Sequence, residues 1–245
     1  MSAPDILRLD RLLSLLSIAT RSQAQMMARK GRILVDGQAA RDASARVSLD
    51  SVFTLDGEEI DTRLTHHLMM NKPAGVLTAA SDRRQKTVMD LLPAKYLSLG
   101  CMPVGRLDRD TRGLLLFTTD GTLNHRLLSP RQEVSKMYEA TVTGLLTQAA
   151  VRRFKEGMDF KEFSSLPAKL EILTAQPMES TARVTVHEGK YHQVKRMFSA
   201  CGHEVISLNR VSFGPLSLDE GLAPGQFRAL TLEELTALQE AAGIG

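Results

Sequence analysis

The first apolar residues of the chain recur at intervals of three or four, which is the spacing of one helical face. They are Ile6, Leu9, Leu13 and Leu16. Ser22 is a suitable cap for a second helix, which we expect to run to Lys30 and to stop at Gly31. The pattern therefore predicts two short helices at the start of the chain.

Short stretches with a strand pattern follow these helices. Arg32–Val35 and Val47–Leu55 are rich in apolar and β-branched residues, and each is followed by an Asp-Gly pair that signals a tight turn. Residues 1–60 are therefore expected to form one small domain of helices and strands. The polar stretch 57–65 is expected to be a linker.

From His66 onward, strands and helices are both predicted, but they do not alternate strictly. The expected strands are His67–Asn71, Leu114–Thr119, Met137–Thr143, Ala168–Leu173, Ala182–His187 and Val205–Asn209. The expected helices span 122–128, 147–156 and 191–201, and a last one begins at Thr231 with a capping box to Glu234. We therefore expect an α+β fold, with a second domain over residues 66–245 whose mixed, mostly antiparallel sheet is flanked by helices.

Composition narrows the class of protein only slightly. The 245 residues are 43% hydrophobic and 24% charged, as in an ordinary globular protein, and the net charge of +3 permits nucleic-acid binding without requiring it. Cys101 and Cys201 lack the spacing of a zinc site or a disulfide framework, which favours a reducing compartment. Charged residues interrupt the first apolar stretch, and no apolar stretch reaches transmembrane length. We therefore expect a cytoplasmic protein.

Basic residues are concentrated in the first predicted domain. Between Arg8 and Arg46, eight basic side chains are accompanied by three acidic ones. Such an excess suits contacts with RNA phosphates, although the ordinary charges of a solvated helix face would give the same count. The candidate RNA-binding residues here are Arg8, Arg21, Arg29, Lys30 and Arg32.

Three segments of this region resemble the alpha-L RNA-binding domain, first known from a ribosomal protein of the small subunit. They are Arg8–Asp10, Thr20–Ala24 and Lys30–Gly37, and the similarity covers about residues 6–55. The hairpin of that domain usually has Asn before its Gly, where this chain has Asp36. The resemblance implies a structured RNA as partner but specifies no reaction.

A charged loop precedes the apolar strand predicted to begin at Leu114. Residues 105–113 read GRLDRDTRG. Among these arginines Asp108 is expected to stay ionised, and an ionised carboxylate can act as a nucleophile or a base. Asp108 and Asp110 can instead hold a metal or form an acid–base pair, and a surface loop with salt bridges has the same composition.

The same loop resembles the catalytic signature of the pseudouridine synthases related to ribosomal small subunit pseudouridine synthase A. Three further segments, Met70–Gly75, Ser135–Tyr138 and Gly189–Phe198, match motifs of this group in the same order along the chain. Met137 stands where the group usually has Thr. The resemblance covers about residues 66–230.

The resemblance implies an RNA pseudouridine synthase that needs no cofactor and no metal. It makes Asp108 the nucleophile, Tyr138 the aromatic residue that packs on the target base, and Lys195 the basic partner of the catalytic carboxylate. Further candidates for shaping the pocket or contacting RNA are Asn71, Lys72, Arg106, Arg112, His192 and Arg196.

Helical spacing gives independent support for a basic surface on the predicted helix 191–201. His192, Lys195 and Arg196 fall on one face, which has no acidic residue. The opposite face consists of Val194, Met197, Phe198 and Cys201. Amphipathic surface helices are common, but a polar face that also holds Ser199 and is basic with no acidic residue suits a carboxylate or an RNA phosphate.

Lys195 occupies a position where many pseudouridine synthases have Arg, and Lys there is similar to the small-subunit branch. The expected partner is therefore rRNA in an assembling small ribosomal subunit, and we expect a monomer. The alternatives are a synthase for large-subunit rRNA and a non-catalytic rRNA-binding assembly factor on the same scaffold. A metal-dependent nuclease that uses Asp108 and Asp110 is a third.

Overall fold

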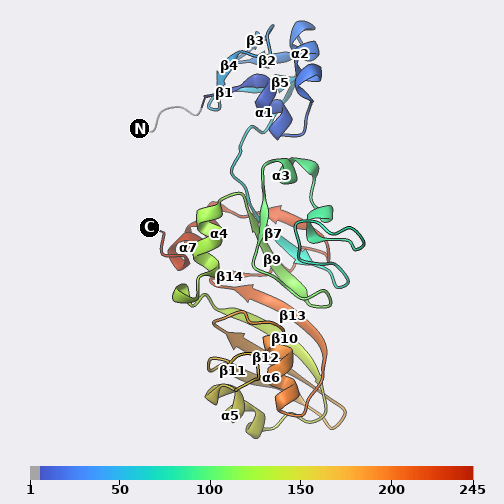
Figure 1. The fold of residues 1–245 in the computed structure, drawn as a ribbon, viewed down its shortest axis with the longest axis vertical. Helices are drawn as coiled ribbons and strands as arrows, with labels where there is room; N and C mark the ends of the chain where they lie inside the picture. Colours follow the sequence, from blue (N-terminus) through green and yellow to red (C-terminus); the bar gives the residue numbers. More distant parts are fainter. Residues whose placement is uncertain (1–5, 245) are drawn as a thin grey trace. The chain divides into compact units, whose positions relative to one another are not determined.

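The computed structural model describes residues 6–244, and the chain divides into two units (Figure 1). The first comprises the described residues up to His66 together with Leu92–Met102. The second comprises His67–Leu91 and the described residues from Pro103 onward. The sequence pattern assigned Leu92–Met102 to the second domain, because nothing local to that segment indicates that it groups with the first unit.

The first unit contains helices and two small antiparallel sheets (Figure 1). The helices are α1 (Leu9–Leu15), α2 (Arg21–Arg29) and α3 (Ala94–Ser98). One sheet has the order β3-β2-β5-β6, formed by Gln38–Ala39, Ile33–Val35, Phe53–Leu55 and Glu58–Glu59. In the other sheet, β1 (Ile6–Arg8) pairs with β4 (Arg46–Ser48).

The starts of the first two helices differ from the sequence prediction. Ile6 lies in β1 rather than in α1 and is exposed, so the first helix begins at Leu9. The cap of α2 is Thr20, not Ser22: the Thr20 hydroxyl accepts from the Gln23 backbone N–H, and the Gln23 side chain accepts from that of Thr20. Both residues suit a cap, and the extended backbone of Thr20 decides between them.

The single strand predicted over Val47–Leu55 is wrong. A turn interrupts it, in which the Ser51 N–H donates to the Ser48 carbonyl and the Asp50 N–H donates to the Ser48 hydroxyl. The two halves, β4 and β5, consequently belong to different sheets. Short polar side chains that bond to the local backbone favour such turns over a continuous strand.

The two Asp-Gly pairs form the hairpin turns that the sequence indicates. Asp36 and Gly37 have φ angles of 50° and 78° between β2 and β3. Asp56 and Gly57 have φ angles of 54° and 91° between β5 and β6. Two successive positive φ angles characterise the turn type that matches the twist of a hairpin. The second hairpin occupies the start of the stretch expected to be a linker.

One hydrophobic cluster stabilises the first unit. It combines one face of α1 and one face of α2 with residues of the small sheets. Its members include Leu9, Leu12, Leu13, Leu16, Ala24, Ala28, Ile33 and Phe53. Leu99 packs against this cluster, and the Ser98 hydroxyl lies 2.7 Å from that of Ser17. These contacts explain why the segment around α3 groups with the first unit.

The second unit is built on a nine-stranded sheet with the order β11-β12-β10-β13-β9-β7-β15 (Figure 1). These strands span, in that order, Lys169–Ala175, Glu179–Val186, Lys136–Thr143, Val205–Phe213, Arg112–Thr118, His67–Lys72 and Phe227–Ala229. Two short strands, β14 (Leu216–Ser217) and β8 (Met102–Val104), pair with β13 and β9. Only the pairing of β13 with β9 is parallel among the seven strands of that order. The predicted α+β fold with a mostly antiparallel sheet is thus confirmed.

Helices in the second unit lie close to the ranges expected from the sequence. They are α4 (Gly121–Leu128), α5 (Gln148–Glu156), α6 (Gln193–Ala200) and α7 (Leu232–Ala241), with 3₁₀ turns at Val88–Leu91 and Pro130–Gln132. The capping box of α7 is present, with Thr231 and Glu234 bonded to each other's backbone N–H. No helix within residues 6–244 is both long and apolar enough to span a membrane.

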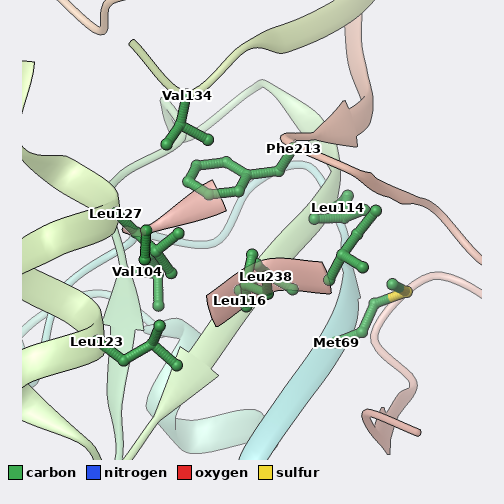
Figure 2. Packing of buried hydrophobic residues seen from close by; sticks show 11 residues of the cluster. Met69, Val104, Leu114, Leu116, Leu123, Leu127, Val134, Phe213 and Leu238 are labelled. Carbon is green, nitrogen blue, oxygen red and sulfur yellow. The ribbon is translucent and has the colours of Figure 1, made fainter. Parts of the chain in front are cut away.

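A buried cluster around Phe213 fixes the strand that follows the charged loop (Figure 2). Leu114 and Leu116 of β9 alternate along the strand and so point to the same face of the sheet. Leu123 and Leu127 of α4, one helical turn apart, pack against them, and so does Leu238 of α7. Because β9 is anchored in this way, the loop that precedes it is attached to a firmly packed strand.

Candidate active site

The loop that carries Asp108 is held from beneath by the buried side chain of Lys72, the last residue of β7. The Lys72 Nζ donates to the carbonyl oxygens of Asp108, Arg109 and Thr111 at 3.1, 3.2 and 2.9 Å, and to that of Pro73 at 3.0 Å. Burial lowers the pKa of Lys72 to about 8, against the opposing effect of the carboxylates of the loop. The side chain is 0% exposed, so it has no surface for RNA and acts by shaping the loop.

The two sides of the loop are fixed by different devices. Before Asp108, the Leu107 carbonyl accepts a hydrogen bond from the Thr78 hydroxyl at 2.8 Å. The Leu107 N–H donates to the oxygen of that Thr78 hydroxyl at 3.2 Å. After it, Gly113 has a φ of 100°, and a β-carbon there would lie 2.3 Å from the backbone oxygen of Arg210. Only glycine permits this close approach of β9 to β13.

The Asp108 carboxylate faces two basic residues of the 189–196 segment. His192 Nε2 lies 3.4 Å from one Asp108 oxygen, and Lys195 Nζ lies 3.4 Å from the other. Lys195 also binds Asp110 at 2.5 Å, and this hydrogen bond lowers the pKa of Asp110. The Asp108 side chain is 28% exposed, whereas that of Asp110 is 74% exposed. Asp108 is therefore the more enclosed of the two carboxylates.

Helix α6 presents its basic face to the loop because its other face is buried. Val194, Met197 and Phe198 are buried, as the helical spacing predicted. Phe198 packs against Phe154 of α5, with ring centroids 5.0 Å apart. His192 is the N-cap of the helix rather than part of its first turn, and it adopts a left-handed conformation with φ of 51°.

A pocket opens above Asp108. Its lining includes Tyr138 of β10, which is 9% exposed, together with Leu107, Val186, Val194 and Leu208 as apolar walls. Its polar lining comprises Arg106, Asp108, Thr111, Glu188, Lys190, His192, Gln193 and Lys195. The pocket thus combines apolar and aromatic walls with a larger number of polar and charged groups, a mixture that suits a flat heteroaromatic base. The three residues assigned catalytic roles by resemblance, Asp108, Tyr138 and Lys195, all line this one pocket.

Of the remaining predicted residues of the second unit, only Arg106 lines this pocket. Arg106 is exposed and lines it, while Arg112 is exposed at the start of β9. Arg196 lies on α6 and binds Glu162 at 2.8 Å. Asn71 is turned away, since its side-chain amide donates to the Leu222 carbonyl. Asn71 therefore ties β7 to the chain around Leu222.

The RNA-binding candidates of the first unit are all exposed. Arg8 forms an ion pair with Asp10 at 2.7 Å, and Arg32 binds Asp56 through two guanidinium nitrogens. The remaining three lie along α2 and its C-terminal end: Arg21, Arg29 and Lys30. These three offer their charges on one short helix.

Sequence reasoning missed two residues that shape the site. Thr78 bonds to a residue 29 positions away, and no local pattern indicates such a contact. Gln193 is buried and bridges its own loop: its amide donates to Glu188 at 2.7 Å, and its oxygen accepts from the Lys190 N–H at 3.1 Å. A polar residue on the apolar side of the predicted helix 191–201 was the available signal for Gln193.

Comparison with known proteins agrees with this geometry. The family profile described as RNA pseudouridylate synthase matches residues 66–200, and that of the S4 domain matches residues 7–52. An RNA pseudouridine synthase of Bacillus subtilis, YtzG, is 42% identical over 96% of this chain and 99% of its own length. Ribosomal small subunit pseudouridine synthase A of Vibrio cholerae is 35% identical over 95% and 99%. Ribosomal large subunit pseudouridine synthase B of Bacillus subtilis is 33% identical over 97% and 98%.

A solved structure shows the same relationship in three dimensions. It is described as a pseudouridylate synthase, is 33% identical, and superimposes with a TM-score of 0.66 over 95% of this chain and 99% of its own. The family profile spans more than half of the chain, and the relatives match nearly all of it. This chain, an isomerase that acts on uridine in RNA, therefore belongs to the RNA pseudouridylate synthase family, with an S4 domain in its first unit.

Proposed function

We propose that the enzyme converts one uridine of ribosomal RNA to pseudouridine, with Asp108 as the nucleophile. The observation that carries this proposal is the position of the Asp108 carboxylate in the pocket, 3.4 Å from both Lys195 Nζ and His192 Nε2. Lys195 stabilises the negative charge and directs the carboxylate toward the pocket. A positioned carboxylate of this kind can form a covalent intermediate.

The reaction is balanced without any co-reactant. The bond between the ribose C1′ and N1 of uracil breaks, the base rotates, and a new bond joins C1′ to C5. C5 then loses its proton and N1 gains one, so the product is an isomer of the substrate. The Asp108 oxygen forms the temporary covalent bond, either to the sugar or to the ring, and leaves when the new bond is complete. Tyr138, at the pocket wall, packs on the base and is the group proposed to assist removal of the C5 proton.

The apolar and aromatic lining of the pocket supports a substrate base that has left its stack. An enzyme that acts on a base must extrude it from the helix, and the flipped base is then held by stacking and apolar contacts. Tyr138 and three apolar neighbours, Leu107, Val186 and Leu208, supply such contacts. In the first unit, Arg21, Arg29 and Lys30 are proposed to bind phosphates of a structured RNA.

Small-subunit rRNA in an assembling particle is the substrate that we favour. Lys195 stands where many pseudouridine synthases have Arg, and a relative named for the small subunit is 35% identical. A relative named for the large subunit is 33% identical, so large-subunit rRNA is the second candidate. We propose that the enzyme acts in the cytoplasm. We also propose that it is a monomer, and light scattering of the purified chain tests this oligomeric state.

Asp108→Asn is the variant that tests the proposal, and Asp110→Asn is its matched control on the same loop. We expect Asp108→Asn to fold, to bind rRNA and to form no pseudouridine, because an amide is a poor nucleophile. We expect Asp110→Asn to remain active, and the activity to be unchanged by a chelator. Pseudouridine formation by Asp108→Asn would overturn the role of Asp108.

Mapping pseudouridines in rRNA from cells with and without the protein identifies the substrate. A site lost from small-subunit rRNA and restored by the wild-type chain, but not by Asp108→Asn, supports the favoured substrate. A site lost from large-subunit rRNA supports the second candidate. Tight rRNA binding with no uridine changed would instead indicate a non-catalytic assembly factor.

A further inference from the structure

An exposed aromatic side chain stands beside the pocket and has no part in the reaction described above. Tyr191, in the loop between β12 and α6, is 69% exposed. Its ring stacks on that of His192, with centroids 3.8 Å apart and planes 19° from parallel. His192 lines the pocket and approaches Asp108 at 3.4 Å. The Tyr191 ring is therefore separated from the catalytic pocket by a single side chain.

Positive charge and further aromatic surface surround this ring. The Arg196 guanidinium carbon lies 5.5 Å from the ring centroid of Tyr191 and 5.5 Å from that of Phe163. Lys190 Nζ lies 5.3 Å from the Phe163 ring. Glu162 binds the edge of Arg196 at 2.8 Å, which fixes the guanidinium in place. Single-stranded nucleic acids are bound by such combinations of aromatic faces and cations.

The backbone holds Tyr191 in a defined position. Residue 192 adopts a left-handed conformation with φ of 51°, which is rare for a residue other than glycine and is concentrated at ligand sites. The buried Gln193 ties the loop together by bonding to the Lys190 N–H and to Glu188. The exposed ring is thus pre-organised, which reduces the entropy lost when it binds a partner.

We propose that Tyr191, backed by His192 and flanked by Arg196, is a stacking platform for an unpaired nucleobase of the RNA next to the target uridine. The proposal rests on the proposed function, because the target base in the pocket determines where its neighbour lies. A base adjacent to a flipped nucleotide has lost one stacking partner, and Tyr191 replaces it. Lys190 and Arg196, which form ion pairs with Glu188 and Glu162, make this surface charged, so it suits RNA rather than an apolar protein surface.

The chain contains no tryptophan, so Tyr191→Trp introduces a single indole fluorophore at the platform. We expect an oligouridylate of about nine nucleotides, a length within the usual range of single-strand binding sites, to quench this fluorescence in the whole 245-residue chain. An abasic oligomer of the same length carries the same phosphates but no bases, and we expect it to leave the fluorescence unchanged. Quenching by both oligomers, or by neither, overturns the proposal.

Affinity measurements on leucine and phenylalanine variants complete the test. We expect Tyr191→Leu to weaken oligouridylate binding by roughly 5- to 100-fold, the range found when one stacking side chain is removed. Tyr191→Phe, which keeps the ring, is expected to bind within about twofold of the wild type, and so is Met178→Ala, a control that alters another exposed side chain. None of these three changes should affect binding of the abasic oligomer. If Tyr191→Leu weakened the binding of both oligomers equally, stacking would be contradicted. Melting temperatures equal to that of the wild type would exclude misfolding of the variants.

The outcome is distinguishable from failure of the proposed function. Quenching of Tyr191→Trp by oligouridylate, in a protein that forms no pseudouridine, would leave the platform intact and overturn the catalytic proposal. Pseudouridine formation without any base-dependent quenching would overturn the platform alone. If the partner of Tyr191 is a protein rather than RNA, Tyr191→Leu would abolish the affinity for that protein and leave oligouridylate binding unchanged. That result would also overturn the platform.

Discussion

Lys195 Nζ lies 2.5 Å from Asp110 but 3.4 Å from Asp108, so the proposed nucleophile shares its cation with a neighbour two residues away. The Asp110 side chain is 74% exposed, and water screens its attraction to Lys195. The contribution of this pair to stability is therefore small. The Lys195 ammonium lies beside the pocket and within reach of both carboxylates.

Replacing Lys195 by Met should lower the single-turnover rate of pseudouridine formation by roughly 100-fold. The cause is the loss of the charge that stabilises the Asp108 carboxylate, and removal of one such group commonly has an effect of this size. Lys195→Arg keeps the charge and should retain most of the rate. Asp110→Asn should cost less than about tenfold, because the ammonium stays beside Asp108. A wild-type rate in Lys195→Met would show that Lys195 is not the partner of the nucleophile.

Lys72→Met should destabilise the protein and abolish activity at the same time. The variant leaves three carbonyl groups of the loop, and that of Pro73, without their donor. The expected cost is about 2–4 kcal/mol in unfolding free energy. Urea unfolding measures the loss, and hydrogen exchange of residues 108–111 reports the loosened loop. Lys86→Met, at an exposed position, is the control. Faster exchange in both variants, or in neither, would show that Lys72 does not hold the loop.

The basic face of α6 was predictable because one local rule determines both of its sides. The 3.6-residue repeat that buries Val194, Met197 and Phe198 also turns Lys195 and Arg196 outward. The proximity of that face to Asp108 was not predictable from spacing. It depends on the parallel pairing of β9 with β13, which joins segments almost 100 residues apart.

The sequence named Lys72 as a candidate for shaping the pocket or contacting RNA, but it could not show that the side chain is buried, because lysine is almost always exposed unless it has a partner. Its partners are backbone carbonyls of a loop more than 35 residues later, and any residue type supplies a carbonyl. The strand break between β4 and β5 was missed for the opposite reason. There, hydrogen bonds from the Asp50 and Ser51 N–H groups to Ser48 form a turn, although the residues before and after it have a composition that favours strands.

Gly113→Ala should reduce the unfolding free energy by more than about 2 kcal/mol, because a new β-carbon would overlap the chain of β13. It would lie 2.3 Å from the Arg210 carbonyl oxygen and 2.4 Å from the Asn209 side chain. Gly121→Ala is the matched control, since no atom lies within 4 Å of its added carbon. That control should change stability by less than about 0.5 kcal/mol. Equal melting temperatures for the two variants would contradict the close approach of β9 and β13.

Lys136 should make the stability of the protein depend on pH in the alkaline range. Its Nζ is buried and donates to the Val134 carbonyl at 2.7 Å, and burial, with a smaller contribution from Arg210, lowers its pKa from 10.5 to about 8. Below pH 8 both folded and unfolded chains are protonated, and the folded chain bears the full cost of the buried charge. Between pH 8 and 10.5 only the unfolded chain keeps the proton, so the unfolding free energy rises with pH.

Lys136→Met isolates this contribution, because Lys72 and other groups titrate in both the variant and the wild type. The stability of the variant minus that of the wild type should fall as the pH is raised from 7 to 10, and the total change should approach about 3 kcal/mol. Urea unfolding at intervals of one pH unit measures the difference. The sign follows from the direction of the pKa shift: the wild type gains stability as Lys136 loses its proton, and methionine has no proton to lose. A difference that stays constant across this range would mean that Lys136 keeps its ordinary pKa in the folded protein.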